Sequence, residues 1–208
     1  MNVLGKQRDF FIRQKTKDVS FRKEALKRLQ KEIIAREDDI AEAIYKDFKK
    51  PKFETLAAET QFVLAELKLT LKNIDHWAAP ERKSASLMNW PSSDWIYREP
   101  YGAVLIIAPW NYPFQLAFAP MIAAVAAGNT VVVKPSEVTP HTASIISEIV
   151  SAVFVTEHVT VVEGGVEVSQ ELLAEKWDYI FFTGSSRVGQ IVYESAAKHL
   201  TPVTLELG

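Results

Sequence analysis

The stretch from Gly102 to Lys134, GAVLIIAPWNYPFQLAFAPMIAAVAAGNTVVVK, decides the fold. Two short apolar runs, AVLIIA and TVVVK, stand near its ends, and a longer segment, QLAFAPMIAAVAAG, lies between them. Short runs that are apolar on both faces are typical of strands in a parallel sheet, and a helix usually crosses over between two such strands. The stretch therefore predicts a strand, a helix and a second strand that lies parallel to the first.

The same pattern continues toward the end of the chain. Three more apolar runs follow, VTVVEG, YIFFTG and VTLEL, and they alternate with the helix-like segments HTASIISEIVSAV, EVSQELLAEK and SRVGQIVYESAAKHL. Right-handed crossovers between such strands build a doubly wound sheet. Residues 102–208 are therefore expected to form an α/β core with a Rossmann-like, doubly wound parallel sheet.

The residues before the sheet have a different pattern. Apolar residues recur there at helical spacing, with Ser20 as the expected N-cap of a helix and Pro51 as a stop. Residues 1–78 are therefore expected to form an N-terminal helical layer. Residues 79–101 mix turn formers with aromatic residues, which predicts a β-hairpin arm of two short strands around the turn 91–94. Such an arm packs either against another subunit or on its own domain.

The composition narrows the class of partner. The 208 residues are 48% hydrophobic and carry a formal net charge of −2 without a block of either sign, so no nucleic-acid surface is indicated. The apolar region 103–133 is interrupted by PWNYP and by Gly128-Asn129, and the N-terminus lacks the pattern of a signal peptide. We expect a cytoplasmic protein without a membrane segment, whose partner is a small molecule or another protein.

Two residue types limit the chemistry. The sequence contains no cysteine, which excludes disulfides, thiolate metal sites and a thiol nucleophile within these residues. The histidines show no metal-ligand spacing, so no metal site is predicted.

Ligands of open α/β sheets bind beyond the carboxyl ends of the strands, so the residues there are candidates. Asn111 follows the first strand in Pro109-Trp110-Asn111-Tyr112. Its amide is either an ordinary turn residue or a rigidly held donor suited to a developing oxyanion. Trp110 and Tyr112 are interpreted as wall or core aromatics.

Two further strand ends carry polar or small residues. Lys134 ends the second strand, where it is poorly placed for a core and well placed to donate to hydroxyls, and Glu137 follows it. Glu137 either contacts a ligand or occupies the first turn of the next helix, where acids are favoured. Gly184, Ser185 and Gly189 lie at a strand-to-helix junction that suits a phosphate, although glycines there also permit a tight turn and close packing.

Together, the segments PWNYPFQLAFAPMIAAVAAGNTVVVKPSE, FFTGSSRVGQ and AAKHLTPVTLELG resemble the N-terminal half of the NAD(P)-dependent aldehyde dehydrogenases. The PWNYPFQL form and the AAKHLTPVTLELG run are most similar to the class 3, or fatty-aldehyde, branch. The resemblance implies that Asn111 supplies the oxyanion-hole amide and that Glu206 is the general base, with a pKa raised by partial burial. It also implies cofactor contacts: Pro109 and Trp110 border the nicotinamide, Lys134 and Glu137 contact the adenosine ribose, and Gly184, Ser185 and Gly189 lie at the diphosphate.

The family mechanism implies what the chain needs besides these residues. A cysteine thiolate attacks the aldehyde, hydride leaves for the nicotinamide, and a water activated by the glutamate hydrolyses the thioester. Acylating relatives lack that glutamate, so Glu206 favours the hydrolytic branch. Since this chain has no cysteine, we expect it to be the cofactor-binding portion of the enzyme, ending at the junction to an absent catalytic domain and inactive alone.

The remaining expectations concern cofactor and partners. An acidic Glu137 near the ribose favours NAD, while Lys134 beside it leaves NADP as the alternative. The substrate implied by the branch is a medium-chain, long-chain or aromatic aldehyde. The full-length protein is expected to be a homodimer that uses the arm. The competing interpretation is a non-enzymatic module that binds a nucleotide or assembles with a partner.

Overall fold

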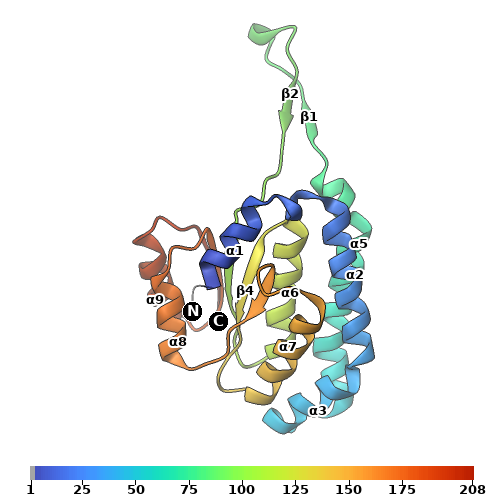
Figure 1. Cartoon of the computed structure of the whole chain (residues 1–208), viewed down its shortest axis with the longest axis vertical. Coiled ribbons are helices and arrows are strands. Elements are labelled where there is room, and N and C mark those ends of the chain that lie inside the picture. Colours follow the sequence, from blue (N-terminus) through green and yellow to red (C-terminus); the bar gives the residue numbers. More distant parts are fainter. Residues whose placement is uncertain (1–2) are drawn as a thin grey trace.

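The computed structural model describes residues 3–208, and its centre is a parallel sheet of five strands (Figure 1). The strands are β3 (Ala103–Ile107), β4 (Thr130–Lys134), β5 (Val159–Val161), β6 (Tyr179–Gly184) and β7 (Val203–Leu207). The connecting helices are α6 (Pro113–Ala127), α7 (Pro140–Val153), α8 (Val166–Ala174) and α9 (Ser186–Ala197). The strand order β5-β4-β3-β6-β7 reverses between β3 and β6, which confirms the Rossmann-like, doubly wound sheet.

Helices cover both faces of this sheet. On one face α6 and α7 lie against Val104 and Ile106, and behind them pack α2 (Val19–Ala35), α3 (Glu37–Phe48) and α5 (Gln61–Ala78). On the other face α8, α9 and α1 (Val3–Ile12) lie against Leu105 and Ile107. Both faces of β3 and β4 are therefore buried, which explains why these strands are apolar at consecutive positions.

The N-terminal segment differs from the expected single helical layer. Its charged sequence forms the helix α1, which packs on the face opposite α2, α3 and α5. Gln7 of α1 is buried and donates from Nε2 to the carbonyl of Val131 at 2.9 Å. The domain boundary at residue 78 stays a prediction.

The residues at which the helices begin and end were predicted in part. The N-cap of α2 is Asp18 rather than Ser20, because the Asp18 carboxylate accepts the backbone N–H of Ser20 at 2.8 Å. Pro51 follows the end of α3 as expected, and it is the N-cap of the short helix α4 (Lys52–Thr55). A π-helical turn over Leu56–Thr60 then joins α4 to α5.

The hairpin arm is present and projects from the body (Figure 1). Strands β1 (Glu81–Lys83) and β2 (Asp94–Ile96) pair antiparallel, with Arg82 opposite Trp95. The connection is longer than the predicted turn 91–94, since it contains the 3₁₀ turn η3 (Leu87–Asn89) and Asp94 already belongs to β2. Because the tip is exposed, the interpretation in which the arm packs on its own domain is wrong.

The structure also bears on the membrane question. Among the helices of residues 3–208, none combines the length and the apolar character needed to cross a bilayer.

Candidate functional site

The predicted site residues gather at the carboxyl edge of the sheet. Lys134 ends β4, Asn111 follows β3, Gly184 ends β6, and Glu206 of β7 lies beside Thr183 of β6. Neighbouring strands are about 4.8 Å apart, so the ends of β4 and β6, on either side of β3, are separated by roughly 10 Å. One edge therefore carries every predicted residue group, around the point where the strand order reverses.

Alternation along the strands sorts these residues onto two faces. On β4, Lys134 shares a face with Val132, which packs in the layer of α8 and α9. On β7, Leu205 packs in that same layer, and the side chain of its neighbour Glu206 points to the other face of the sheet. Lys134 therefore points toward the α8–α9 side, and Glu206 points toward the α6 side.

The turn between β3 and α6 holds Asn111, whose side chain is exposed. Its neighbours Trp110 and Tyr112 are 55% and 41% exposed, so they are not core aromatics, and their alternative interpretation as wall residues stays a prediction. Each instead lies against the end of α3 or the residues that follow it. The ring of Trp110 is 6.4 Å from that of Phe48, and the ammonium of Lys50 lies 4.7 Å from the centre of the Tyr112 ring.

Lys134 is buried at 1% exposure, so the expectation that it is poorly placed for a core is wrong. Its ammonium is satisfied locally, because Nζ donates to the carboxylate of Glu137 and to the carbonyl of Pro135, both at 2.9 Å. Partial burial is the largest single influence and raises the pKa of Glu137, but the hydrogen bond from Lys134, a backbone hydrogen bond and the charge of Lys134 together outweigh it, so the pKa of Glu137 is lowered. The two residues form a charged pair whose Glu137 side is exposed to solvent.

The start of α9 contains the predicted diphosphate residues. Ser185 is the N-cap, and its Oγ accepts the backbone N–H of Val188 at 3.4 Å. A Cβ on Gly184 would lie 2.6 Å from Cζ of Phe182, and one on Gly189 would lie 2.6 Å from Cδ2 of Leu207. Close packing therefore accounts for both glycines, and the exposed Ser185 leaves the helix end open to solvent.

The start of α6, in contrast, is closed by a residue that the sequence analysis missed. The carboxylate of Glu59 is fully buried and accepts the backbone N–H groups of Phe114 at 2.9 Å and Gln115 at 3.4 Å. An anion is therefore already bound at this helix N-terminus. Periodicity could have indicated that Glu59 is buried, because it lies four residues before Val63 and eight before Leu67 on the same face, but it does not indicate the contact with α6.

Glu206 lies where the sequence placed it but in other surroundings. Its side chain is exposed, so the expected partial burial is absent and that expectation is wrong for this chain. The physical reason is its place on β7, an edge strand of the sheet, while α6 and α7 cover β3 and β4.

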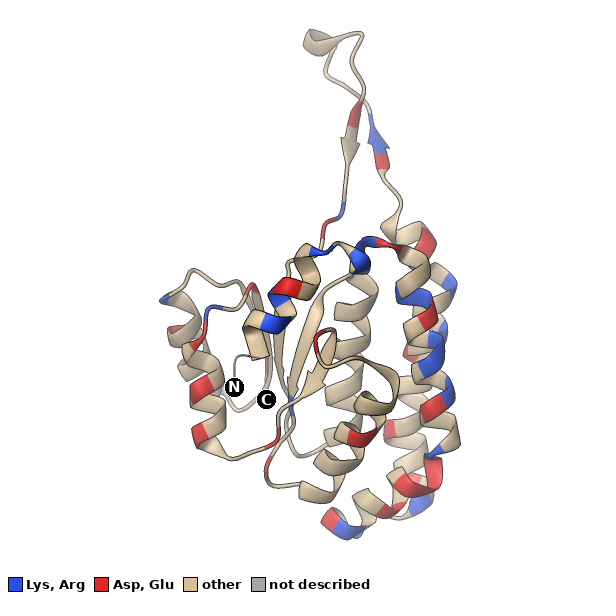
Figure 2. Cartoon of the chain, viewed as in Figure 1, with Lys and Arg blue, Asp and Glu red and all other residues tan. Residues whose placement is uncertain are grey.

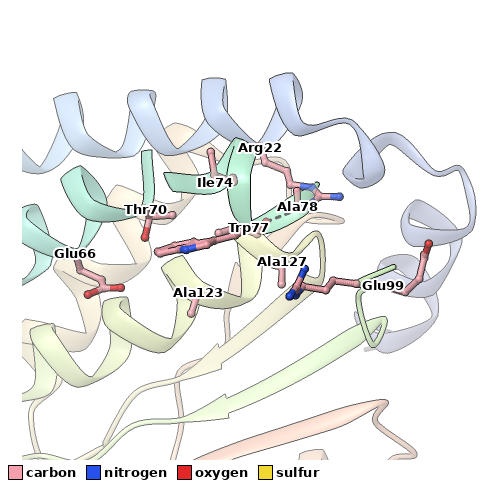
Figure 3. Close-up of a pocket in the computed structure, with 11 residues that line it drawn as sticks. Arg22, Glu66, Thr70, Ile74, Trp77, Ala78, Glu99, Ala123 and Ala127 are labelled. Carbon is pink, nitrogen blue, oxygen red and sulfur yellow. Dashed lines mark hydrogen bonds between the residues drawn. The ribbon is translucent and has the colours of Figure 1, made fainter. Parts of the chain in front are cut away.

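Other possible sites lie elsewhere or are missing from the described residues. Within residues 3–208, no group of three His, Cys, Asp or Glu side chains could hold a metal ion. A cavity of about 240 Å³ lies near the far end of α6, where Trp77, Ala123 and Ala127 line it (Figure 3). It is separated from the turn with Asn111 by most of the length of α6.

Comparison with known proteins decides the family. The model of the aldehyde dehydrogenase family matches residues 8–208. The chain belongs to the aldehyde dehydrogenase family. This assignment confirms the resemblance drawn from the PWNYP, FFTGSS and LELG motifs.

Curated aldehyde dehydrogenases match along the whole chain. The 4,4'-diaponeurosporen-aldehyde dehydrogenase of Staphylococcus aureus is 46% identical over 100% of this chain and 46% of its own length. A Mus musculus enzyme named aldehyde dehydrogenase, dimeric NADP-preferring, is 41% identical over 100% of this chain and 46% of its own. Others are named members of aldehyde dehydrogenase family 3, which confirms the class 3 branch. The chain spans less than half the length of these relatives.

Solved aldehyde dehydrogenases share the fold. The substrate-bound Staphylococcus aureus AldH superposes with a TM-score of 0.98 at 47% identity, over 99% of this chain and 45% of that one. A Mycobacterium tuberculosis aldehyde dehydrogenase complexed with NAD+ gives 0.81 at 30% identity, over 90% and 38%. The similarity therefore includes the sheet edge that carries the candidate residues.

Proposed function

We propose that this chain is the cofactor-binding portion of an NAD(P)-dependent aldehyde dehydrogenase that oxidises aldehydes to carboxylic acids. The observation that carries the proposal is the division of one sheet edge between two faces. Lys134 and the open N-terminus of α9 lie on the face of the sheet that α8 and α9 cover. Glu206 points toward the opposite face, which α6 covers. Cofactor and reacting aldehyde thereby meet at the edge from opposite faces.

The residues present fit a dinucleotide. Among the helices that begin at this edge, α6 is closed by Glu59 and α7 by Asp47, whereas α9 is open and suits the diphosphate. Glu137 can accept from a ribose hydroxyl while Lys134 donates to it, with Gly184, Ser185 and Gly189 at the diphosphate. Pro109 and Trp110 border the nicotinamide end. When bound, the nicotinamide accepts a hydride.

The remaining chemistry of this chain belongs to two side chains. The amide Nδ2 of Asn111 donates to the oxyanion of the tetrahedral intermediate, where a preorganised donor stabilises charge that develops in the transition state. The carboxylate of Glu206 takes a proton from the water that attacks the thioester. The thiolate that forms this thioester cannot come from these 208 residues, because they include no cysteine.

The experiment is a calorimetric titration of the purified chain with NAD and NADP, followed by a turnover assay. We expect NAD to bind, more tightly than NADP because the Glu137 carboxylate repels a 2'-phosphate. We expect Lys134→Met to weaken binding of both cofactors about tenfold, since one charge-assisted hydrogen bond is worth about 1.4 kcal/mol or more. NADH should not form with an aldehyde present.

Three results would count against this proposal. Absence of NAD binding would remove the cofactor role, and equal affinities for NAD and NADP would remove the preference. Aldehyde-dependent NADH formation by the cysteine-free chain would contradict the predicted inactivity.

The missing thiol also favours a second candidate, a non-enzymatic module that binds a nucleotide or assembles with a partner. The two candidates agree on fold and cofactor binding and differ in the coding sequence beyond Gly208. Codons that continue into a region with a cysteine would support the enzyme. A stop codon directly after Gly208, together with retained NAD binding, would support the module.

The finer properties extend the same proposal. The substrate class is a medium-chain, long-chain or aromatic aldehyde, as the class 3 branch implies; the 46% identical Staphylococcus aureus relative is named for one aldehyde, 4,4'-diaponeurosporen-aldehyde. The full-length protein is proposed to be a cytoplasmic homodimer.

A further inference from the structure

Glu59 is a buried carboxylate that the proposed reaction does not use. It lies on the π-helical turn between α4 and α5 and is 0% exposed. A buried charge is costly unless it is paired and hydrogen-bonded. Here Oε1 is 2.7 Å from Nζ of Lys50, whose side chain is itself 10% exposed, and Oε2 accepts the N–H groups at the start of α6.

Glu59 replaces a missing cap. Tyr112 is the N-cap residue of α6, and its side chain makes no capping hydrogen bond. The first N–H groups of a helix need an acceptor, and the positive end of the helix dipole favours a negative one. The Glu59 carboxylate is both an acceptor and a negative charge, and it lies 55 positions before Phe114 in the chain. The orientation of this helix start is thus tied to the α4–α5 junction.

The turn before α6 is held at further points by the end of α3 and the residues that follow it. Trp110 lies against Phe48, and Tyr112 lies beneath the ammonium of Lys50. Asn111 stands between these two aromatic residues, and its own side chain is exposed. The residues on either side of Asn111 are therefore anchored, and the anchors converge on the ion pair of Lys50 with Glu59.

We propose that Glu59, paired with Lys50, is a positioning residue that fixes the turn 109–113 and thereby aims the amide of Asn111. The effect of Glu59 on catalysis rests on the proposed function, in which Asn111 donates to the oxyanion. Such a donor works at roughly 2.7 to 3.1 Å from the oxyanion, and a misplacement of about 1 Å can lower a rate about 10²-fold. A turn without a rigid anchor would not meet that demand.

The first test measures the position of Asn111 in the chain itself, without turnover. In spectra of the ¹⁵N-labelled protein, Asn111→Ala identifies the Asn111 side-chain amide signals by their loss. Glu59→Ala should shift or broaden these signals well below the unfolding temperature. The double variant Lys50→Met/Glu59→Gln should restore them, because the Gln oxygen still accepts from Phe114 and no buried charge is left unpaired.

A control separates positioning from stability. Ile74 of α5 is buried at the opposite end of that helix, so Ile74→Ala destabilises the protein without touching the turn. Its Asn111 signals should remain as in the native chain. Unchanged signals in Glu59→Ala, or an equal change in Ile74→Ala, would overturn the proposal. If Glu59→Ala does not fold, Glu59→Gln alone gives the comparison, because it removes the charge that pairs with Lys50 while keeping the shape of the side chain.

The second test applies to the complete protein that carries the thiol. Glu59→Ala should lower kcat by about 10²-fold with a much smaller change in KM for the cofactor, because the turn borders only the nicotinamide end, while the start of α9 and the Lys134–Glu137 pair hold the rest. A rise in cofactor KM with kcat retained would contradict the proposal. If the complete native protein oxidises no aldehyde, the proposed function fails, whereas the spectroscopic result still decides whether Glu59 positions Asn111.

Discussion

At the scale of single residues, a buried polar group can be predicted from the sequence only where the topology of the sheet places it. Lys134 and Glu59 are both buried and both paired, yet only Lys134 could be picked from the sequence. It stands at the end of an apolar strand, where topology alone places it at the ligand edge. Glu59 acts through a partner 55 residues away, and no local pattern contains that contact.

His158 is a buried residue with a measurable effect on stability. It packs against Phe10, Phe21 and Phe154, with ring centroids 5.3 to 5.5 Å apart, and within residues 3–208 its buried Nε2 has no hydrogen-bond partner. Burial, with a smaller contribution from Arg28, lowers the pKa of His158 from 6.5 to about 4. The unfolded chain therefore binds a proton that the folded chain does not take up between these two values.

This difference predicts that stability is complete above pH 6.5 and falls as the pH drops toward 4, since the unfolded state then binds more protons. The total loss is about 3 kcal/mol, and roughly 2 kcal/mol of it occurs by pH 5. Urea unfolding at pH 7 and pH 5 measures the change. The variant His158→Phe should lose that much less between the two conditions, and an identical loss in both proteins would refute the assignment.

At the scale of elements, the strands of the sheet were predictable almost to the residue. Both faces of β3 and β4 are covered, so burial on both sides requires the apolar runs 103–108 and 130–134. The helix α1 was not predictable in the same way. Only its residues Leu4 and Gln7 are buried, and charged residues among the apolar ones weaken its amphipathic pattern. The length of the arm connection likewise depends on a 3₁₀ turn without a strong local signal.

The entry to β3 depends on a glycine. Gly102 has φ +135°, and a Cβ there would lie 2.4 Å from Oδ2 of Asp178, the oxygen that accepts the N–H of Ala103 at 2.8 Å. Gly102→Ala should therefore lower the free energy of unfolding by about 1 to 3 kcal/mol through backbone strain and a displaced Asp178. Thermal unfolding followed by circular dichroism measures it. Gly208→Ala is the control, since nothing lies within 4 Å of its added Cβ, and equal melting temperatures for the two variants would contradict the prediction.

At the scale of the whole molecule, sequence and structure agree on where function lies but differ in what each can resolve. The sheet edge follows from topology, so the positions of Asn111 and Glu206 could be predicted from the order of strands. Their surroundings could not, because exposure depends on which helices cover which strand. Glu206 shows this directly, since the edge position of β7 leaves its carboxylate in solvent.

The arm is the feature of the whole molecule that most needs a partner. Its tip carries Leu87 and Met88, each 94% exposed, and Trp90 at 80%, and Figure 2 shows no charged residue there. Exposed apolar clusters of this kind mark association surfaces. We predict that the chain self-associates through the arm, so its average mass in sedimentation should rise with concentration. Leu87→Ser/Met88→Ser/Trp90→Ser should abolish that rise, while Phe53→Ser, which removes an 84% exposed aromatic from α4, should leave it. A rise that persists in the triple variant would assign the association to another surface, such as the uncovered edge of β7.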